Sequence, residues 1–188
     1  MISPYFTLRR PDFKGDYRLD NILSHVANAG IKVNIIVYNG PKLALNIDSE
    51  FTQTYLSSLS DNIKVMLHPH YVLIPFLWSH HEKMIVIDQR IAFMGGLDLG
   101  YGRYDNNKHL LTDPKAEIWF GADYCNYRTS DILEPQKYAS CSIERKHTPR
   151  MPWHDIGVKL AGGSVQDLAR HFIQYWNYVN LQDNMDDR

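Results

Sequence analysis

A histidine and a lysine two residues apart open an apolar segment that reads His-Glu-Lys-Met-Ile-Val-Ile-Asp, from His81 to Asp88. We predict a strand over residues 80–87, and because side chains alternate faces along a strand, His81 and Lys83 then point the same way. The lysine can neutralise a phosphoryl oxygen, and its charge keeps the neighbouring imidazole neutral and nucleophilic near neutral pH. The pair indicates attack on a phosphate.

The residues after this pair predict a β-hairpin. Residues 88–90 are typical of a tight polar turn, and residues 91–94 predict a second short strand. Ile85 and Ile87 continue the face of the pair, and we expect both faces of the hairpin to be buried, one against helices and one toward a second half that this sequence lacks. Asp88 falls at the turn, and by strand alternation it points to the opposite face from His81 and Lys83. We therefore expect it to hold the hairpin or to support the site without touching substrate.

Two glycines, Gly95 and Gly96, end the second strand. Glycines at such a place let a backbone approach a phosphate closely, and Asp98 would lie at the rim of that site. A pair of glycines alone is weak evidence. Behind His81 and Lys83 in this register, it strengthens the prediction of a phosphate-binding site made from Lys83, Gly95, Gly96 and Asp98.

The elements that must position these residues follow an α/β pattern. Apolar spacing predicts a helix over 18–29 and strands over 31–38 and 63–67, with a helix capped by Ser49 between the strands. Ser164 caps a last helix over 164–178. This order is typical of a mixed β-sheet flanked by helices.

We expect one domain over residues 1–188. Within it, residues 1–16 form an irregular opening segment, residues 105–150 form long loops, and residues 181–188 form a frayed acidic tail. With 44% apolar residues, the chain can fill the core of one such domain.

Composition narrows the possible partners. The formal net charge of −1 argues against nucleic-acid binding through bulk positive charge. Cys125 and Cys141 suggest neither a metal site nor a disulfide framework, and we expect no metal or other cofactor. The longest apolar run, residues 71–78, is too short for a bilayer span and is either a core strand or a lipid-contacting edge. Without a visible secretory leader, we expect a cytoplasmic protein, peripheral if it meets intracellular membranes or the plasma membrane.

The pattern His81-x-Lys83-x4-Asp88 followed by Gly95-Gly96 resembles the HKD motif of the phospholipase D superfamily. Further blocks extend the resemblance to eukaryotic phosphatidylcholine-hydrolysing phospholipase D and cover nearly the whole chain. These blocks are residues 18–20, 43–50, 62–66, 98–103, 111–113, 123–126, 148–155 and 169–174. The resemblance implies one half of the two-fold phospholipase D catalytic fold, acting on phospholipid membranes.

The resemblance also implies a mechanism and partners. Two HKD halves share one metal-free site: one histidine forms a phosphohistidine, and the other protonates the leaving alcohol. By this match His81 is the nucleophile, Lys83 binds phosphate, and Asp155 is the carboxylate that bonds the other nitrogen of His81. Water then releases phosphatidic acid and choline, or a primary alcohol gives a phosphatidyl-alcohol. Control by phosphoinositides and small GTPases is implied in the same way.

The chain contains only one His-x-Lys-x4-Asp. We therefore expect an N-terminal catalytic half, a fragment of a longer enzyme that is inactive alone. Two alternatives stay open: a homodimeric HKD phosphodiesterase or nuclease in which each copy gives one motif, and an inert fragment that binds a membrane or a partner.

Three features have a plainer interpretation beside the functional one. The histidines at 68, 70, 80 and 81 could bind zinc, but no cysteine joins them and two of them flank a proline. Asp155 could be a surface carboxylate. The basic cluster of residues 145–150 could meet anionic lipid or be ordinary exposed loop charge.

Overall fold

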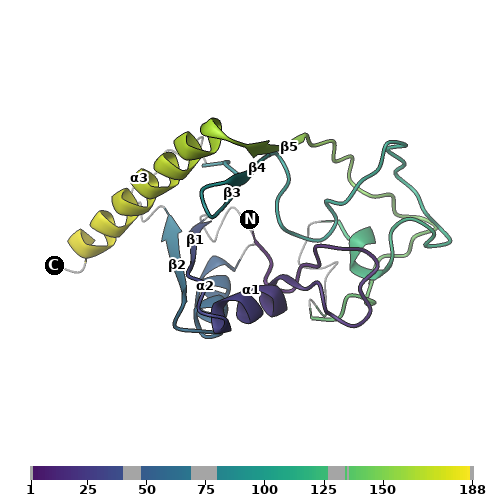
Figure 1. Ribbon diagram of the computed structural model, residues 1–188. Helices are drawn as coiled ribbons and strands as arrows, with labels where there is room; N and C mark the ends of the chain where they lie inside the picture. Colours follow the sequence, from purple (N-terminus) through teal and green to yellow (C-terminus); the bar gives the residue numbers. More distant parts are fainter. Residues whose placement is uncertain (1, 40–47, 69–79, 127–133, 135, 187–188) are drawn as a thin grey trace.

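The computed structural model describes residues 2–39, 48–68, 80–126, 134 and 136–186, and Figure 1 shows their arrangement. The α-helices and strands lie on one side of the molecule, and the long connections of residues 100–126 and 136–150, with one short helical turn, lie on the other (Figure 1). The C-terminal helix runs along the edge of the structured side. This arrangement confirms an α/β fold with parallel and antiparallel strand pairs flanked by helices.

The first half forms a parallel pair of strands covered by two helices. The chain runs through α1 (Leu19–Asn28), β1 (Val33–Tyr38), α2 (Ser49–Ser57) and β2 (Ile63–His68). Parallel strands need a crossover connection, which α2 supplies between β1 and β2. The apolar faces meet in a core of Ala27, Val37, Leu56, Ile63, Val65 and Leu67. The predicted order of helices and strands is confirmed.

The cap of α2 differs from the prediction by one residue. The Asp48 carboxylate accepts a 2.8 Å hydrogen bond from the Phe51 backbone amide and caps the helix. The Ser49 hydroxyl instead donates to the carbonyl oxygen of Tyr38 at 2.8 Å. Ser49 therefore joins the start of α2 to the end of β1.

The second half contains an antiparallel sheet in the order β3-β4-β5. Its strands are β3 (Met84–Ile87), β4 (Ile91–Gly95) and β5 (Gly157–Ala161). The turn between β3 and β4 has positive φ at Asp88 (51°) and Gln89 (54°), as in the turns that match hairpin twist. The predicted hairpin and turn are confirmed, and β5 adds a third strand beside the hairpin shortly after Asp155.

The two faces of this sheet are buried to different degrees. Ala92 of β4 is fully buried, and α3 packs against all three strands. On the opposite face Ile85, Ile87 and Phe93 are 42%, 46% and 40% exposed. The predicted packing of one face against a helix is confirmed, and nothing in the described part of the chain covers the second face, which we expected to meet the missing half.

Helix α3 (Gly163–Asp186) links the two sheets, since it contacts β2 as well as β3, β4 and β5. Val165, Ala169 and Val179 are its buried positions, whereas Ile173 is half exposed. The helix continues through Asp186, eight residues beyond the predicted end at residue 178. No described helix has the length and apolar character needed to cross a membrane.

Buried polar contacts hold the long loops, which contain the short 3-10 helix η1 (Gly121–Tyr124). Asp113 accepts hydrogen bonds from the amides of residues 117, 118 and 119 at 2.9 Å each. Burial alone would raise the pKa of the Asp113 carboxyl, but these bonds hold it below its ordinary value.

Arg150 does not belong to an exposed basic patch. Its side chain lies 4.0 Å from the Trp119 ring centroid and donates to the carbonyl oxygens of Gly102 (3.0 Å) and Tyr104 (2.6 Å). Only 4% of Arg150 is exposed, and burial lowers the pKa of its guanidinium. Both interpretations of residues 145–150, lipid contact and ordinary exposed charge, are wrong for Arg150, which stabilises the loops.

Candidate active site

His81 and Lys83 lie just before β3. Residues 80–83 have no regular secondary structure, and β3 begins at Met84, so the predicted strand over 80–87 starts four residues too early. One further backbone bond extends the pairing, because the Gly95 amide donates to the Lys83 carbonyl oxygen at 3.3 Å. His81 is exposed, and its imidazole makes no hydrogen bond within the described part of the chain.

Lys83 is held by Asp98. Its ammonium nitrogen lies 3.4 Å from Asp98 Oδ1 and donates to the His81 carbonyl oxygen at 3.1 Å. Asp98 is 7% exposed. Burial on its own would raise the pKa of the Asp98 carboxyl, but the surrounding positive charges, those of Lys83 and Arg103 among them, hold it below the ordinary value. Asp98 therefore serves to orient the lysine.

Arg103 joins two carboxylates beneath this pair. It donates to Asp98 Oδ2 through Nη1 at 2.7 Å, and through Nη2 to Asp155 Oδ2 and to the Gly96 carbonyl oxygen (3.0 Å). Its guanidinium carbon lies 4.0 Å from the Trp153 ring centroid. Because Arg103 is only 5% exposed, it forms a buried hub from which Lys83 and Asp155 are both positioned.

The glycine pair provides close packing in this structure. The Gly96 amide donates to the Ile156 carbonyl oxygen at 3.0 Å, as the Gly95 amide does to Lys83, so neither N–H is free for a phosphate. A β-carbon at Gly95 would lie 2.8 Å from the Gly157 α-carbon, and one at Gly96 would collide with the Asp155 carboxylate. The observed role of the glycines is thus to bring β4, β5 and Asp155 together.

A cavity of about 1110 Å³ connects these residues. Its walls come from the hairpin sheet, the end of β1, the face of α3 with Phe172 and Tyr175, and the segment around Trp153. Of the predicted site residues, the lining includes His81, Lys83, Gly95, Asp98 and Asp155. In the described part of the chain, no group of three or more His, Cys, Asp or Glu residues is arranged to hold a metal ion, and His70 lies outside that part.

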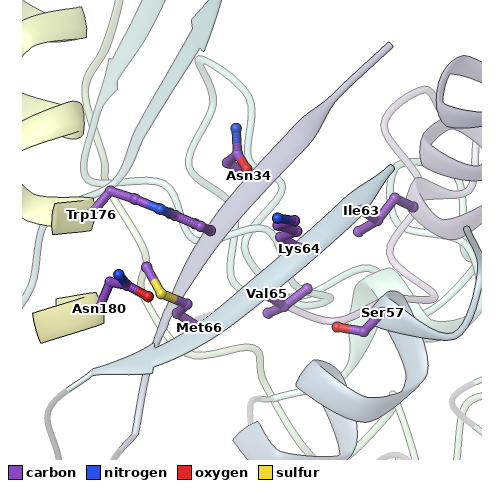
Figure 2. A pocket seen from close by; sticks show the side chains of 8 residues that line it. All are labelled: Asn34, Ser57, Ile63, Lys64, Val65, Met66, Trp176 and Asn180. Carbon is purple, nitrogen blue, oxygen red and sulfur yellow. The ribbon is translucent and has the colours of Figure 1, made fainter. Parts of the chain in front are cut away.

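A second pocket, of about 550 Å³, lies between α3 and β2 and is separate from this cavity (Figure 2). Trp176 and Asn180 of α3 form one wall, and Met66 of β2 lies opposite them (Figure 2). Lys64 is the one ionisable residue in its lining. Its lining contains neither a histidine nor a carboxylate, whereas the larger cavity brings His81, Lys83 and Asp155 together, so the larger cavity is the candidate active site.

Comparison with known proteins agrees with this assignment. The family model for phospholipase D matches residues 5–187. The chain belongs to the phospholipase D family. Over 95% of its length it is 41% identical to phospholipase D zeta 1 of Arabidopsis thaliana, 40% identical to phospholipase D2 of Bos taurus, and 40% identical to phospholipase D1 of Saccharomyces cerevisiae. It spans only 16%, 22% and 11% of the lengths of these relatives. The resemblance found in the sequence is confirmed.

One of the two aspartates given a role lies as expected and the other does not. Asp88 is exposed at the hairpin turn, at the end of β3 opposite to His81, and does not line the cavity, which agrees with the expectation that it does not touch substrate. The predicted hydrogen bond between Asp155 and His81 is not formed, because the Asp155 carboxylate bonds to Arg103. The two residues still line the same cavity.

Sequence reasoning assigned no role to Arg103. The sequence did contain a feature that points to Arg103, because this residue ends one of the blocks that resemble phospholipase D, five residues after Asp98. An arginine near two aspartates is common on protein surfaces, however, and only the fold shows that this one is buried between them.

Proposed function

We propose that this chain supplies the nucleophilic half of a phospholipase D active site, with His81 as nucleophile. A ring nitrogen of His81 attacks phosphorus, an N–P bond forms, and the P–O bond to the head-group alcohol breaks. A proton from an acid outside this chain neutralises the leaving oxygen. Water then attacks phosphorus, the N–P bond breaks, and a phosphatidic acid leaves. A primary alcohol in place of water gives a phosphatidyl-alcohol.

The observation that carries the proposal is the placement of His81 and Lys83 in one open cavity. His81 has no competing hydrogen bond in the described part of the chain, so a ring nitrogen is available to a substrate. Lys83 is fixed at the side by Asp98, 3.4 Å away, and can stabilise the charge that develops on a phosphoryl oxygen. Asp155 remains our candidate for orienting His81 during the reaction, once substrate has entered.

The charge balance of the site supports a second catalytic half. The cations Lys83 and Arg103 are matched by the carboxylates Asp98 and Asp155, so these four groups carry no net charge. A phosphodiester anion gains little electrostatic stabilisation from four groups whose charges cancel. A second HKD half would add both the missing acid and a second lysine, and the exposed apolar face with Ile85 and Phe93 offers a surface for it.

The substrate that we propose is phosphatidylcholine, which gives choline and phosphatidic acid. The sequence blocks shared with the eukaryotic lipid-hydrolysing branch support this substrate, and on the same basis we propose that the complete protein acts at a membrane surface in the cytoplasm. Control by phosphoinositides and small GTPases stays a prediction of the family resemblance.

The test is covalent trapping on the complete protein that carries this chain. Vesicles of phosphatidylcholine labelled in the phosphatidyl group should release choline, and rapid quenching should leave label on the peptide that contains His81. His81→Asn should abolish both signals. His147→Asn, which changes a 75% exposed histidine, should change neither. Label on another peptide, or full activity in His81→Asn, would show that His81 is not the nucleophile.

A further inference from the structure

The segment that carries the proposed nucleophile has little support of its own. Residues 80–83 lie outside the β3–β4 ladder, and among the described residues the only ladder-type bond that reaches them is the one from the Gly95 amide to the Lys83 carbonyl oxygen. The His81 ring bonds to no described group. Apart from the bond that its carbonyl oxygen accepts from Lys83, His81 therefore depends for its position on how the two neighbouring residues, His80 and Glu82, are held.

Glu82 binds two imidazoles with one carboxylate. Its Oε2 atom lies 3.2 Å from Nε2 of His80, and its Oε1 atom lies 3.0 Å from Nε2 of His171 in α3. The Glu82 side chain is only 19% exposed. A hydrogen bond from an imidazole N–H to a carboxylate is charge-assisted, so the bond from His171 ties the side chain of Glu82 to α3.

His80 is held by the same helix one turn further on. Its ring stacks on Tyr175 with centroids 4.9 Å apart and an interplanar angle of 24°. The Tyr175 hydroxyl bonds to Nδ1 of His68 at the end of β2. Because His171 and Tyr175 are four residues apart on α3, they lie on one face of the helix. Both neighbours of His81 are thus attached to that face.

We propose that His171, Tyr175 and Glu82 are positioning residues that hold the His81–Lys83 segment in its reactive place against α3. This inference rests on the proposed function, since it assumes that the position of His81 matters for turnover. None of the three needs to touch the reacting atoms. Their effect should fall on the rate of the chemical step, because a displacement of about 1 Å of a reacting group can cost about 100-fold in rate.

The first test replaces His171 in the complete protein. His171→Leu should lower kcat for choline release by about 10–100-fold, with KM nearly unchanged. Amide hydrogen exchange of residues 80–84 should become at least about tenfold faster, because the segment opens more often. His171→Gln keeps an N–H donor and should restore most of both signals. Arg170→Leu, which changes the adjacent exposed residue paired with Asp167, should alter neither.

A second variant makes the test independent of the first. Tyr175→Leu removes the ring on which His80 stacks and should speed exchange of the same peptide, again with a loss in kcat. Unchanged exchange and unchanged kcat in both variants would overturn the inference, and so would a loss that His171→Gln fails to restore. If the wild-type protein released no choline, the proposed function would fall, whereas the exchange data would still decide whether α3 holds this segment.

Discussion

Replacement of Arg103 by methionine tests whether this buried arginine organises the site. Methionine keeps much of the aliphatic volume beside Trp153 but removes the three donated hydrogen bonds to Asp98, Asp155 and the Gly96 carbonyl oxygen. The variant leaves two aspartates without the cation that separates them. Removal of one partner from a buried ion pair typically costs about 3–5 kcal/mol, because the other charge stays buried and unmatched.

We expect the lower part of that range. Asp155 is 20% exposed at its side chain, and Asp98 keeps Lys83 at 3.4 Å. A loss of about 3–4 kcal/mol in the free energy of unfolding corresponds to a fall of about 6–16 °C in Tm for a chain of this size.

The deficit should depend on pH in a defined direction. Asp98 has a lowered pKa in the folded protein, so its ionised form contributes stability above its unfolded pKa and loses that contribution as the pH falls through the folded pKa. Without Arg103, the folded pKa of Asp98 rises and its neutralisation begins at a higher pH. The difference in the free energy of unfolding between wild type and variant should therefore become smaller as the pH is lowered from about 7 to about 4.

The assay is thermal and urea unfolding of both proteins across that pH range. Arg170→Met is the matched control, since its ion pair with Asp167 is exposed and should contribute less than about 1 kcal/mol. Arg103→Lys should recover only part of the loss, because an ammonium cannot bridge both carboxylates with a planar fork. A Tm within 2 °C of wild type, by the scaling of about 2–4 °C per kcal/mol, would refute the role of Arg103 as the hub.

Three further predictions concern the glycine pair, Asp155 and the isolated chain. Gly96→Ala should lower both Tm and turnover of the complete protein, because the methyl group collides with the Asp155 carboxylate, whereas Gly163→Ala meets no atom within 4 Å and should be neutral. Asp155→Asn should keep the fold, measured by circular dichroism, yet lower kcat by about 10–100-fold; unchanged kcat would remove Asp155 from the mechanism. The 188-residue chain alone should release choline at least about 100-fold more slowly than the complete protein, since the positioned acid is missing. Robust release by the purified monomer would contradict this.

Local sequence was sufficient for most of the fold. The hairpin follows from an apolar run that residues 88–90 interrupt. These three polar residues form the turn that joins β3 to β4. The strand β5 follows from the apolar stretch after Asp155. The start of β3 could not be predicted in this way, because residues 80–83 are apolar-flanked like a strand but only Lys83 finds a ladder partner. Whether a residue joins a sheet depends on a neighbour distant in sequence.

The reactive residues of the site were easier to predict than the residues that hold them in position. The spacing of His81 and Lys83 is visible in three residues, whereas the contact of Arg103 with Asp155 spans 52 residues. It exists because β5 pairs with β4 in the register that sets Gly95 opposite Gly157. That register carries Asp155 past the end of the sheet to Gly96, where only a glycine leaves room for its carboxylate.

The same geometry separates the rigid and the dependent parts of the site. Asp98, Arg103 and Asp155 hold one another through ion pairs at the end of β4, so Lys83 meets a carboxylate fixed by the sheet. The His81 imidazole has no such partner among the described residues. Its backbone carbonyl oxygen accepts a hydrogen bond from Lys83, and its two neighbours attach to α3. A shift of α3 relative to the sheet would therefore pull on the segment that carries the nucleophile while Asp98 holds the lysine. The distance between the two functional groups thus depends on the packing of α3 on the sheet as well as on the bond from Lys83 to the His81 carbonyl oxygen.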